Sequence, residues 1–217
     1  MLIAATLLFV TQLPPLIAID PGHPSEVGSG THGKKITELK VAWQIGVALN
    51  ERLKSLGYRT VMTKSTENEK VTNRRRAEIG NEAKASLMVR LHCDAGSGSG
   101  FAVFYPTQQG TSHGVKGPSV EVLKGSKREA NLFYLGLSQS LKGQLNNQGL
   151  KSDLATAIGG QQGALTGSVF SKVPVVLVEM VVLTNPKDEG FILSKTGQNA
   201  MVKGLADGVR AAVPLVH

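Results

Sequence analysis

Short apolar runs alternate with amphipathic segments along most of the chain, from Leu16 onward. This alternation is typical of an α/β domain, in which helices cover a central sheet. Thr37 is suited to cap the first helix, which carries one apolar stripe, and Gly57 is suited to end it. The pattern predicts strands over Leu16–Asp20, Tyr58–Thr63, Leu87–Leu91, Phe101–Tyr105 and Val173–Val178, and helices over Glu38–Leu56, Val71–Ala83, Glu129–Leu145 and Lys187–Ala212, the last with breaks near Gly190 and Ser194.

The predicted elements fit one three-layer α/β domain, in which helices flank a mostly parallel or mixed sheet of about six strands. Val173–Val178 is too continuously apolar for a sheet edge, so we expect it near the centre, beside the strands that lead to His23 and His92. Pro106–Ser126 is rich in glycine and serine and is predicted to be a long surface loop. Gly149–Ser171 has no clear pattern and receives no prediction.

The first fifteen residues form a separate, largely apolar segment. Met1–Val10 has the length of the hydrophobic region of a signal peptide, but it lacks the basic residues that precede such a region. Residues 1–15 are therefore interpreted as either a signal remnant or an edge strand, and residues 16–217 as one folded domain. No later stretch approaches the roughly 20 apolar residues that a transmembrane helix needs.

Composition and charge narrow the classes of partner. Lys and Arg number 24 against 16 Asp and Glu, and the net charge of +8 suits an anionic partner such as nucleic acid or a cell surface. Aromatic residues make up only 5% of the chain and are not interleaved with basic ones, which makes nucleic acid the weaker of these two choices. Cys93 is the single cysteine, so the chain has neither an internal disulfide nor a cysteine-based zinc finger.

Four residues with metal-binding or acid–base side chains lie where a predicted strand ends or a helix begins. They are His23, Glu38, His92 and Glu179. In α/β sheets such positions converge outside the carboxyl ends of the strands. Two imidazoles and a carboxylate form the ligand set of many catalytic zinc sites, and a second carboxylate nearby acts as general acid and base.

Each of the four also has a plainer explanation. A histidine after a strand is often only a hydrogen-bonded loop residue, and an acid at a helix start is favoured by the helix dipole. Glu179 is harder to explain in this way, because a carboxylate after six apolar residues is costly unless it is paired, solvated or near a metal. Spacing alone therefore indicates a metal hydrolase and no particular substrate.

Several short motifs occur in one order and are specific as a set. They are Ile19-Asp20-Pro21-Gly22-His23, a glutamate fifteen residues later, an R-x-x-x-x-N segment from Arg76 to Asn81, His92-Cys93-Asp94-Ala95, and the run from Pro174 to Glu179. This set resembles the zinc-dependent N-acetylmuramoyl-L-alanine amidases of the Amidase_3 family, and the resemblance extends from Leu16 to Val213.

The resemblance implies a site, a substrate and a location. His23, Glu38 and His92 would bind Zn²⁺, and Glu179 would be the catalytic acid and base. The reaction would be hydrolysis of the amide between N-acetylmuramic acid and L-alanine in peptidoglycan, by an exported, monomeric enzyme of the periplasm or cell wall. Residues 16–217 would be its catalytic domain, and anionic wall polymers would account for the positive charge.

Several other residues near these motifs are candidates for orienting the ligands or binding the substrate. Asp20 is interpreted either as a group that orients a ligand imidazole or the strand-end loop, or as a simple turn residue. Arg90 stands where the family usually has a small hydroxyl residue, and strand alternation places it on the face of His92. It either meets a substrate carboxylate or faces solvent. Arg76 is a second candidate for substrate binding. The family's Thr-Arg pair is Thr63-Lys64 here, and Met180 replaces the glycine that usually follows the catalytic glutamate.

Three other functions stay open from the sequence. A zinc peptidase or carboxypeptidase acting on the stem peptides would use the same ligands, but its products would not begin with L-alanine. A catalytically silent wall-binding regulator is also possible, although no ligand residue is missing. Nucleic-acid binding would have to survive physiological salt.

Overall fold

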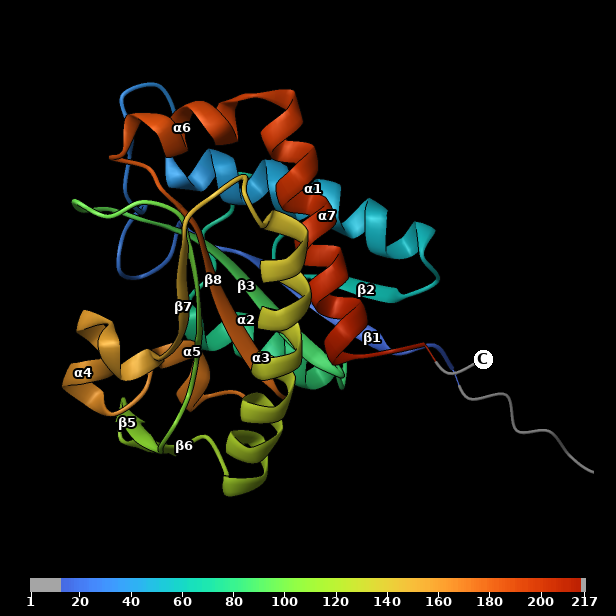
Figure 1. Ribbon diagram of the computed structural model, residues 1–217. Helices are drawn as coiled ribbons and strands as arrows, with labels where there is room; N and C mark the ends of the chain where they lie inside the picture. The colour runs from blue at the N-terminus through green and yellow to red at the C-terminus, as the bar shows by residue number, and fades with distance from the viewer. Residues whose placement is uncertain (1–12, 216–217) are drawn as a thin grey trace, which may run out of the picture.

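The computed structural model describes residues 13–215, so most of the predicted N-terminal segment, residues 1–12, lies outside the described part. The centre of the domain is a six-stranded sheet with the order β2-β1-β3-β8-β4-β7 (Figure 1). β1, β2, β3 and β8 are parallel, whereas β4 and β7 run the opposite way. The strands span Leu16–Pro21 (β1), Arg59–Met62 (β2), Leu87–Asp94 (β3), Phe101–Tyr105 (β4), Asn147–Ser152 (β7) and Val175–Val182 (β8).

Helices cover both faces of this sheet, which confirms the three-layer α/β fold. α1 (Glu38–Ser55), α3 (Val120–Leu141) and α7 (Lys195–Ala212) pack on one face and enclose the larger core (Figure 1). α2 (Asn73–Glu82) and the short α5 (Thr166–Val169) lie on the other face. Within residues 13–215, no helix combines the length and the hydropathy needed to cross a bilayer.

β8 lies between β3 and β4, as its continuous apolar run predicts. Val176, Val178 and Met180 point into the larger core, whereas Leu177 and Glu179 point to the face of α2 and α5. β8 adjoins β3, which carries His92, whereas β1, which leads to His23, lies one strand further away. Helices on both faces explain why the run is apolar throughout.

β3 and β8 are longer than the sequence predicts. The parallel ladder between them continues through the pair His92 and Glu179 and, after a bulge, reaches Asp94 and Val182. The expectation that the strands end before His92 and Glu179 is therefore wrong: both residues lie inside strands. Paired strands in a sheet hold their side chains more rigidly than a loop would.

The first helix begins and ends where the sequence places it. The Thr37 hydroxyl accepts a hydrogen bond from the Lys40 N–H at 3.3 Å, and the chain leaves the helix through Gly57 with φ of +95°. This capping fixes Glu38 in the first turn of α1, with its side chain buried.

Two of the sequence predictions are wrong in the middle of the chain. Pro106–Ser126 is not one long loop, because it holds a hairpin, β5 (Gly110–Ser112) and β6 (Val115–Gly117), and then the first turns of α3. The turn of the hairpin has φ of +50° at His113 and +74° at Gly114, which suits a tight two-residue connection. The predicted helix Glu129–Leu145 begins too late and ends too late, because the Ser119 hydroxyl accepts from the Val122 N–H and caps α3 well before Glu129.

The remaining elements lie in the stretch without a prediction and near the C-terminus. Gly149–Ser171 contains the end of β7, a 3₁₀ turn η1 (Asp153–Ala155), α4 (Ala157–Gln162) and α5. The predicted break at Ser194 is confirmed, since it separates α6 (Pro186–Leu193) from α7. The predicted break at Gly190 is wrong, because that residue lies inside α6.

Candidate metal centre and active site

His23 lies directly beyond β1 in a tight turn, where its φ is +58°. Its Nδ1 lies 3.1 Å from the carbonyl oxygen of Gly28. Because a carbonyl only accepts, Nδ1 carries the hydrogen, and Nε2 of a neutral ring then presents a lone pair. That Nε2 lies 3.2 Å from Oε1 of Glu38, so a lone pair faces a carboxylate oxygen. A shared cation, either a proton or a metal ion, is needed between them.

Glu38 is held by the backbone on both of its oxygens. Its Oε2 accepts from the Thr31 N–H at 2.8 Å, and its Oε1 accepts from the Cys93 N–H at 3.1 Å. Oε1 also lies 2.9 Å from Nδ1 of His92. The carboxylate thus joins the loop after β1, the start of α1 and the end of β3 at one point.

The side chains of His23, Glu38 and His92 form one cluster, as the sequence predicts. One ligand atom from each lies within 4.8 Å of the other two. The two imidazole rings meet edge to face, with centroids 5.1 Å apart. No other group of three or more such side chains within residues 13–215 meets the same criterion.

The surroundings of the cluster fit a metal ion. Nε2 of His92 is shielded from solvent and has no hydrogen-bond partner in the described part of the chain. Two glycines make room for the ligands: a methyl group on Gly22 would lie 2.6 Å from the His92 ring, and one on Gly30 would lie 2.5 Å from Oε2 of Glu38. A nitrogen, nitrogen and carboxylate donor set is one that zinc accepts.

The electrostatics of the cluster favour an ionised Glu38 and act in opposite directions on the two histidines. Burial raises the pKa of Glu38, but hydrogen bonds with His23 and His92 outweigh it and hold the pKa well below its usual range. Burial lowers the pKa of His23, and the hydrogen bond and negative charge of Glu38 outweigh this and raise it. Burial dominates at His92 and lowers its pKa, which favours a neutral ring. Neutral imidazole and ionised carboxylate are the forms that bind metals.

Glu179 lies beside the cluster without belonging to it. It is paired in register with His92, so the two side chains share the face of the sheet on which α2 and α5 pack. Its Oε2 is shielded from solvent and has no hydrogen-bond partner among residues 13–215. Burial, with the negative charges of Glu38 and Asp94, raises the pKa of Glu179 well above its usual range. A carboxyl group whose pKa is raised from its usual range towards the working pH is suited to act as a general acid and base.

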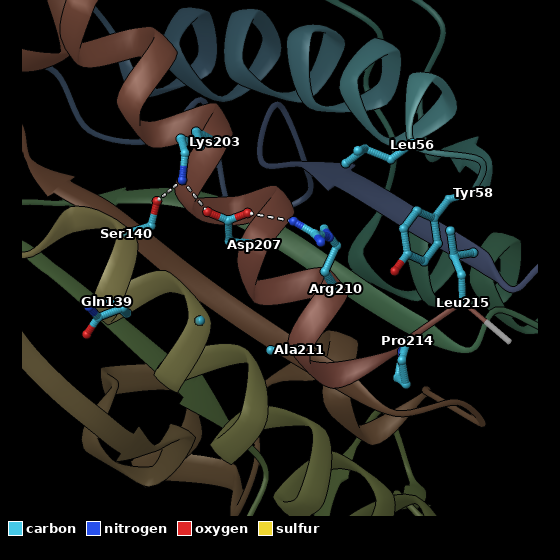
Figure 2. A pocket seen from close by; sticks show the side chains of 11 residues that line it. Leu56, Tyr58, Gln139, Ser140, Lys203, Asp207, Arg210, Ala211, Pro214 and Leu215 are labelled. Atoms are coloured by element: carbon cyan, nitrogen blue, oxygen red, sulfur yellow. Dashed lines mark hydrogen bonds and ion pairs between the residues drawn. The ribbon is translucent and has the colours of Figure 1, made fainter. Parts of the chain in front are cut away.

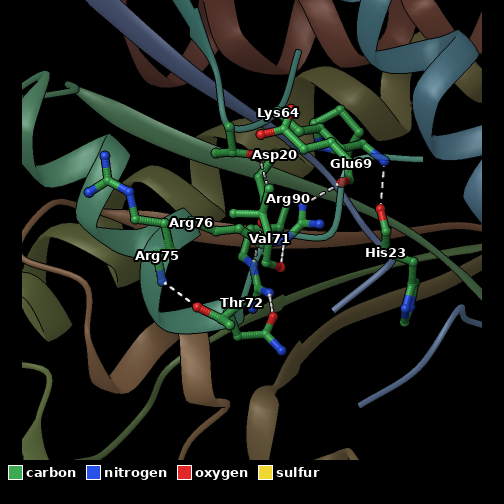
Figure 3. A network of polar contacts seen from close by, with 12 residues as sticks. Asp20, His23, Lys64, Glu69, Val71, Thr72, Arg75, Arg76 and Arg90 are labelled. Carbon is green, nitrogen blue, oxygen red and sulfur yellow. Dashed lines mark hydrogen bonds and ion pairs between the residues drawn. The ribbon is translucent and has the colours of Figure 1, made fainter. Parts of the chain in front are cut away.

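Asp20 occupies the centre of a buried ion-pair network that includes Arg76 and Arg90 (Figure 3). Its carboxylate accepts from Arg76 Nη1 at 2.7 Å, from Arg90 Nε at 2.9 Å and from the Thr63 hydroxyl at 2.6 Å. These guanidinium charges and hydrogen bonds outweigh burial, which would raise the pKa of Asp20, and hold it well below the usual range. Asp20 makes no hydrogen bond with His23 or His92, and it is linked to the strand-end loop through Arg76, which also donates to the carbonyls of Pro21 and Pro24.

Arg76 and Arg90 are both buried, but they differ in how many of their nitrogen atoms form hydrogen bonds with the protein. Arg76 donates to Asp20 and to the carbonyls of Val71, Pro21 and Pro24, so all its nitrogens bind the protein. Arg76 therefore supports the loop that carries His23, and its role in binding substrate stays a prediction. Arg90 is only 3% exposed, so a solvent-facing role is wrong.

Two supporting residues were not identified from the sequence. Lys64 is buried and donates through Nζ to the carbonyl of His23 at 2.5 Å and to that of Glu67 at 2.9 Å. Burial lowers its pKa to about 8. Glu189, on α6, accepts from the Lys35 N–H at 2.6 Å and so holds the loop before α1. In the sequence, the only sign of a role for Lys64 was that Thr63-Lys64 replaces the Thr-Arg pair of the family, and Glu189 had no such sign.

A small cavity of about 150 Å³ opens beside Glu179 and His92. Arg90 and Asn73 also line it, together with residues of α4 and α5. A larger cavity of about 940 Å³ lies between the end of α1, α3 and α7, where Lys203, Asp207 and Arg210 line it (Figure 2). None of the four candidate residues lines the larger cavity, so the smaller one is the cavity that adjoins the metal centre.

The fold brings a donor set that could hold a metal ion to the carboxyl ends of parallel strands, where the active sites of α/β enzymes lie. Residues 17–211 match the profile of Amidase_3, N-acetylmuramoyl-L-alanine amidase, and the chain belongs to this family. The family cleaves the amide between N-acetylmuramic acid and L-alanine in peptidoglycan, and membership supports this activity over the peptidase and binding alternatives.

Individual relatives agree with the family. The chain is 26% identical over 220 residues to N-acetylmuramoyl-L-alanine amidase Rv3717 of Mycobacterium tuberculosis, with 88% of this chain and 85% of the relative covered. Its fold is similar to that of the amidase Ami1 of Mycobacterium smegmatis, with a TM-score of 0.75, 22% identity, and 94% and 99% of the two chains covered. AmiC2 of Nostoc punctiforme gives a TM-score of 0.71 at 22% identity, with 90% and 94% covered.

Proposed function

We propose that this chain is a zinc-dependent N-acetylmuramoyl-L-alanine amidase in which His23, Glu38 and His92 bind the metal and Glu179 is the catalytic acid and base. The observation that carries the proposal is the cluster itself, in which three ligand atoms lie within 4.8 Å of one another. Three protein ligands leave a fourth position for water or substrate, as catalytic zinc sites require.

The protein groups around the centre divide the remaining work. When bound, zinc polarises the scissile carbonyl and lowers the pKa of water. Glu179 accepts the proton of the attacking water and donates it to the nitrogen of L-alanine as the amide bond breaks. The carbonyl of Gly28 holds the His23 ring, and backbone N–H groups hold Glu38. These contacts fix the ligands before substrate arrives.

The substrate also indicates where the enzyme acts. Because peptidoglycan lies outside the cytoplasmic membrane, we expect an exported, monomeric enzyme in the periplasm or cell wall. The net charge of +8 suits contact with anionic wall polymers as well as with the stem peptides.

Metal analysis combined with digestion of peptidoglycan tests this function. We expect about one zinc ion per chain, and loss of activity on chelation that returns when zinc is added. The products should be peptides that begin with L-alanine and glycan strands of unchanged length. Activity that is indifferent to a chelator, or peptides that begin with another residue, would contradict the proposal.

A further inference from the structure

The small cavity beside Glu179 is lined by the buried, charged Arg90 and, near its entrance, by apolar side chains. Arg90 lies at the floor, two residues before His92 on β3. Val27 and Ile158 line the mouth and are 61% and 38% exposed. The cavity volume of about 150 Å³ is well above the roughly 10–15 Å³ that a single water molecule needs, so a carboxylate group fits.

Arg90 is fixed in place with one part of its guanidinium unused. Nε donates to Asp20 at 2.9 Å and Nη2 donates to Asn73 Oδ1 at 2.6 Å. Nη1 makes no hydrogen bond within residues 13–215, although Arg90 lines the cavity. A methyl group on Gly167 would lie 2.5 Å from this Nη1, so the glycine keeps the space beside it open. Because hydrogen bonds hold Nε and Nη2 in place, the free Nη1 is a hydrogen-bond donor with a fixed direction.

Arg90 shares its ion-pair partner. Asp20 is the only acid in the described part of the chain that forms an ion pair with Arg90, and Asp20 is also paired with Arg76. The carboxyl groups of Glu26, Asp153 and Glu179 interact with Arg90 electrostatically without forming an ion pair. Because the Arg90 guanidinium is buried, an anion that reaches its free Nη1 gains more from it than from a solvated arginine.

If the chain has the proposed amidase function, the position of Glu179 indicates which part of the substrate enters the cavity. Glu179 gives its proton to the amine of L-alanine, so the wall that it forms lies on the peptide side of the scissile bond. The next residue of the stem peptide is a glutamate linked through its side chain. Its α-carboxyl group is either free or amidated.

We propose that Arg90 is a specificity-determining residue that binds the free carboxylate on the second residue of the stem peptide and selects it over the amide. The carboxylate accepts a charge-assisted hydrogen bond from Nη1, the one guanidinium nitrogen of Arg90 that no residue of the described chain occupies. The amide offers a neutral oxygen and brings an N–H₂ donor towards a cation, so it binds less well.

The test compares two substrates that differ only at this group. The zinc-loaded full chain is given N-acetylmuramoyl-L-alanyl-D-isoglutamate and its isoglutamine counterpart, and kcat/KM is measured for each. We expect the parent to favour the carboxylate by about tenfold to a hundredfold, the scale of one charged hydrogen bond. In Arg90→Gln the ratio should fall to about one. The ratio is independent of the fraction of protein that is folded.

Two further variants separate this role from general effects. Gly167→Ala keeps Arg90 but fills the space beside Nη1, so it should also lower the ratio, and it replaces Arg90→Gln if that variant does not fold. Arg74→Gln removes a positive charge from an exposed side chain of α2 outside the cavity, and the ratio should stay at the parental value.

Each failure has its own meaning. A parent that cleaves both substrates equally well, or an Arg90→Gln or Gly167→Ala protein that keeps the full preference, would overturn the inference and leave the amidase function intact. A zinc-loaded parent that cleaves neither these substrates nor peptidoglycan would instead reject the proposed function, and the inference with it.

Discussion

Glu179→Gln tests whether the carboxyl group beside the metal centre moves protons without binding the metal. Glutamine has nearly the same size, and the Oε2 that it replaces makes no hydrogen bond with residues 13–215, so no contact with the protein is lost. Glutamine cannot take up the proton of the attacking water. We expect zinc to stay near one per chain and turnover to fall by roughly 10²- to 10⁴-fold, the usual scale of acid–base catalysis.

The same substitution has a predictable effect on stability in the metal-free protein. Burial and the charges of Glu38 and Asp94 raise the pKa of Glu179 above its ordinary value of 4.5. The folded parent therefore binds more protons than the unfolded chain at higher pH, and its stability decreases as pH rises from about 4.5 towards the folded pKa. A pKa that is higher by one in the folded state than in the unfolded chain corresponds to about 1.4 kcal/mol of unfolding free energy. Glu179→Gln has no carboxyl group to titrate at this position and so lacks this pH-dependent loss of stability. The difference in unfolding free energy between the variant and the parent should therefore grow in favour of the variant as the pH rises above about 4.5.

The assays are metal analysis, digestion of peptidoglycan, and urea unfolding of the metal-free proteins at several pH values. Glu51→Gln, at an exposed site on α1, is the matched control and should change none of the three. A Glu179→Gln protein that loses its zinc would make Glu179 a ligand. One that cleaves at the parental rate would place proton transfer elsewhere. A stability difference that does not grow with pH would refute the electrostatic reasoning.

Three more substitutions test the support of the site. His23→Ala should lower zinc content and activity together, and full zinc occupancy in this variant would remove His23 from the ligand set. Asp20→Asn leaves two buried guanidinium groups without their anion and should cost about 3–5 kcal/mol in urea unfolding at neutral pH. Because the folded pKa of Asp20 lies below its ordinary value of 3.8, this difference is full above that pH and should shrink as pH falls through the folded pKa; a difference that is the same at every pH would argue against the ion pairs. Gly30→Ala places a methyl group 2.5 Å from Glu38 Oε2 at φ of +83°, so zinc competition with a chelator should show at least about tenfold weaker binding, and parental affinity would show that the loop adapts.

Local signals predicted the elements that depend on neighbouring residues. The cap at Thr37 and the stop at Gly57 are short-range hydrogen-bond and backbone features, and both are confirmed. The apolar run up to Val178 predicted a central strand because both faces of such a strand are covered. The hairpin inside Pro106–Ser126 was missed because glycine and serine are typical of surface loops as well as of tight turns.

The sequence pattern predicts the direction of the Arg90 side chain but not the residues that surround it. Alternation along the strand correctly places Arg90 on the face of His92, but it does not show whether that face is open or covered. The covering elements are α2, with Asn73, and the segment of α4 and α5 that the sequence left without a prediction. These elements bury the guanidinium, and Asn73 of α2 accepts from Nη2, while Asp20 of β1 accepts from Nε.

The sequence by itself determined the fold class, most of the central strands and the first helix, the family, and the residue types that could bind a metal, because these depend on periodicity, capping and short motifs. Only the tertiary structure decided that His23, Glu38 and His92 meet within 4.8 Å, that Glu179 lies in register beside them, and that Asp20 is shared by two arginines. These facts depend on which strands pair and in which register. A register is chosen by the packing of the whole sheet against its helices, and no short stretch of sequence carries that information.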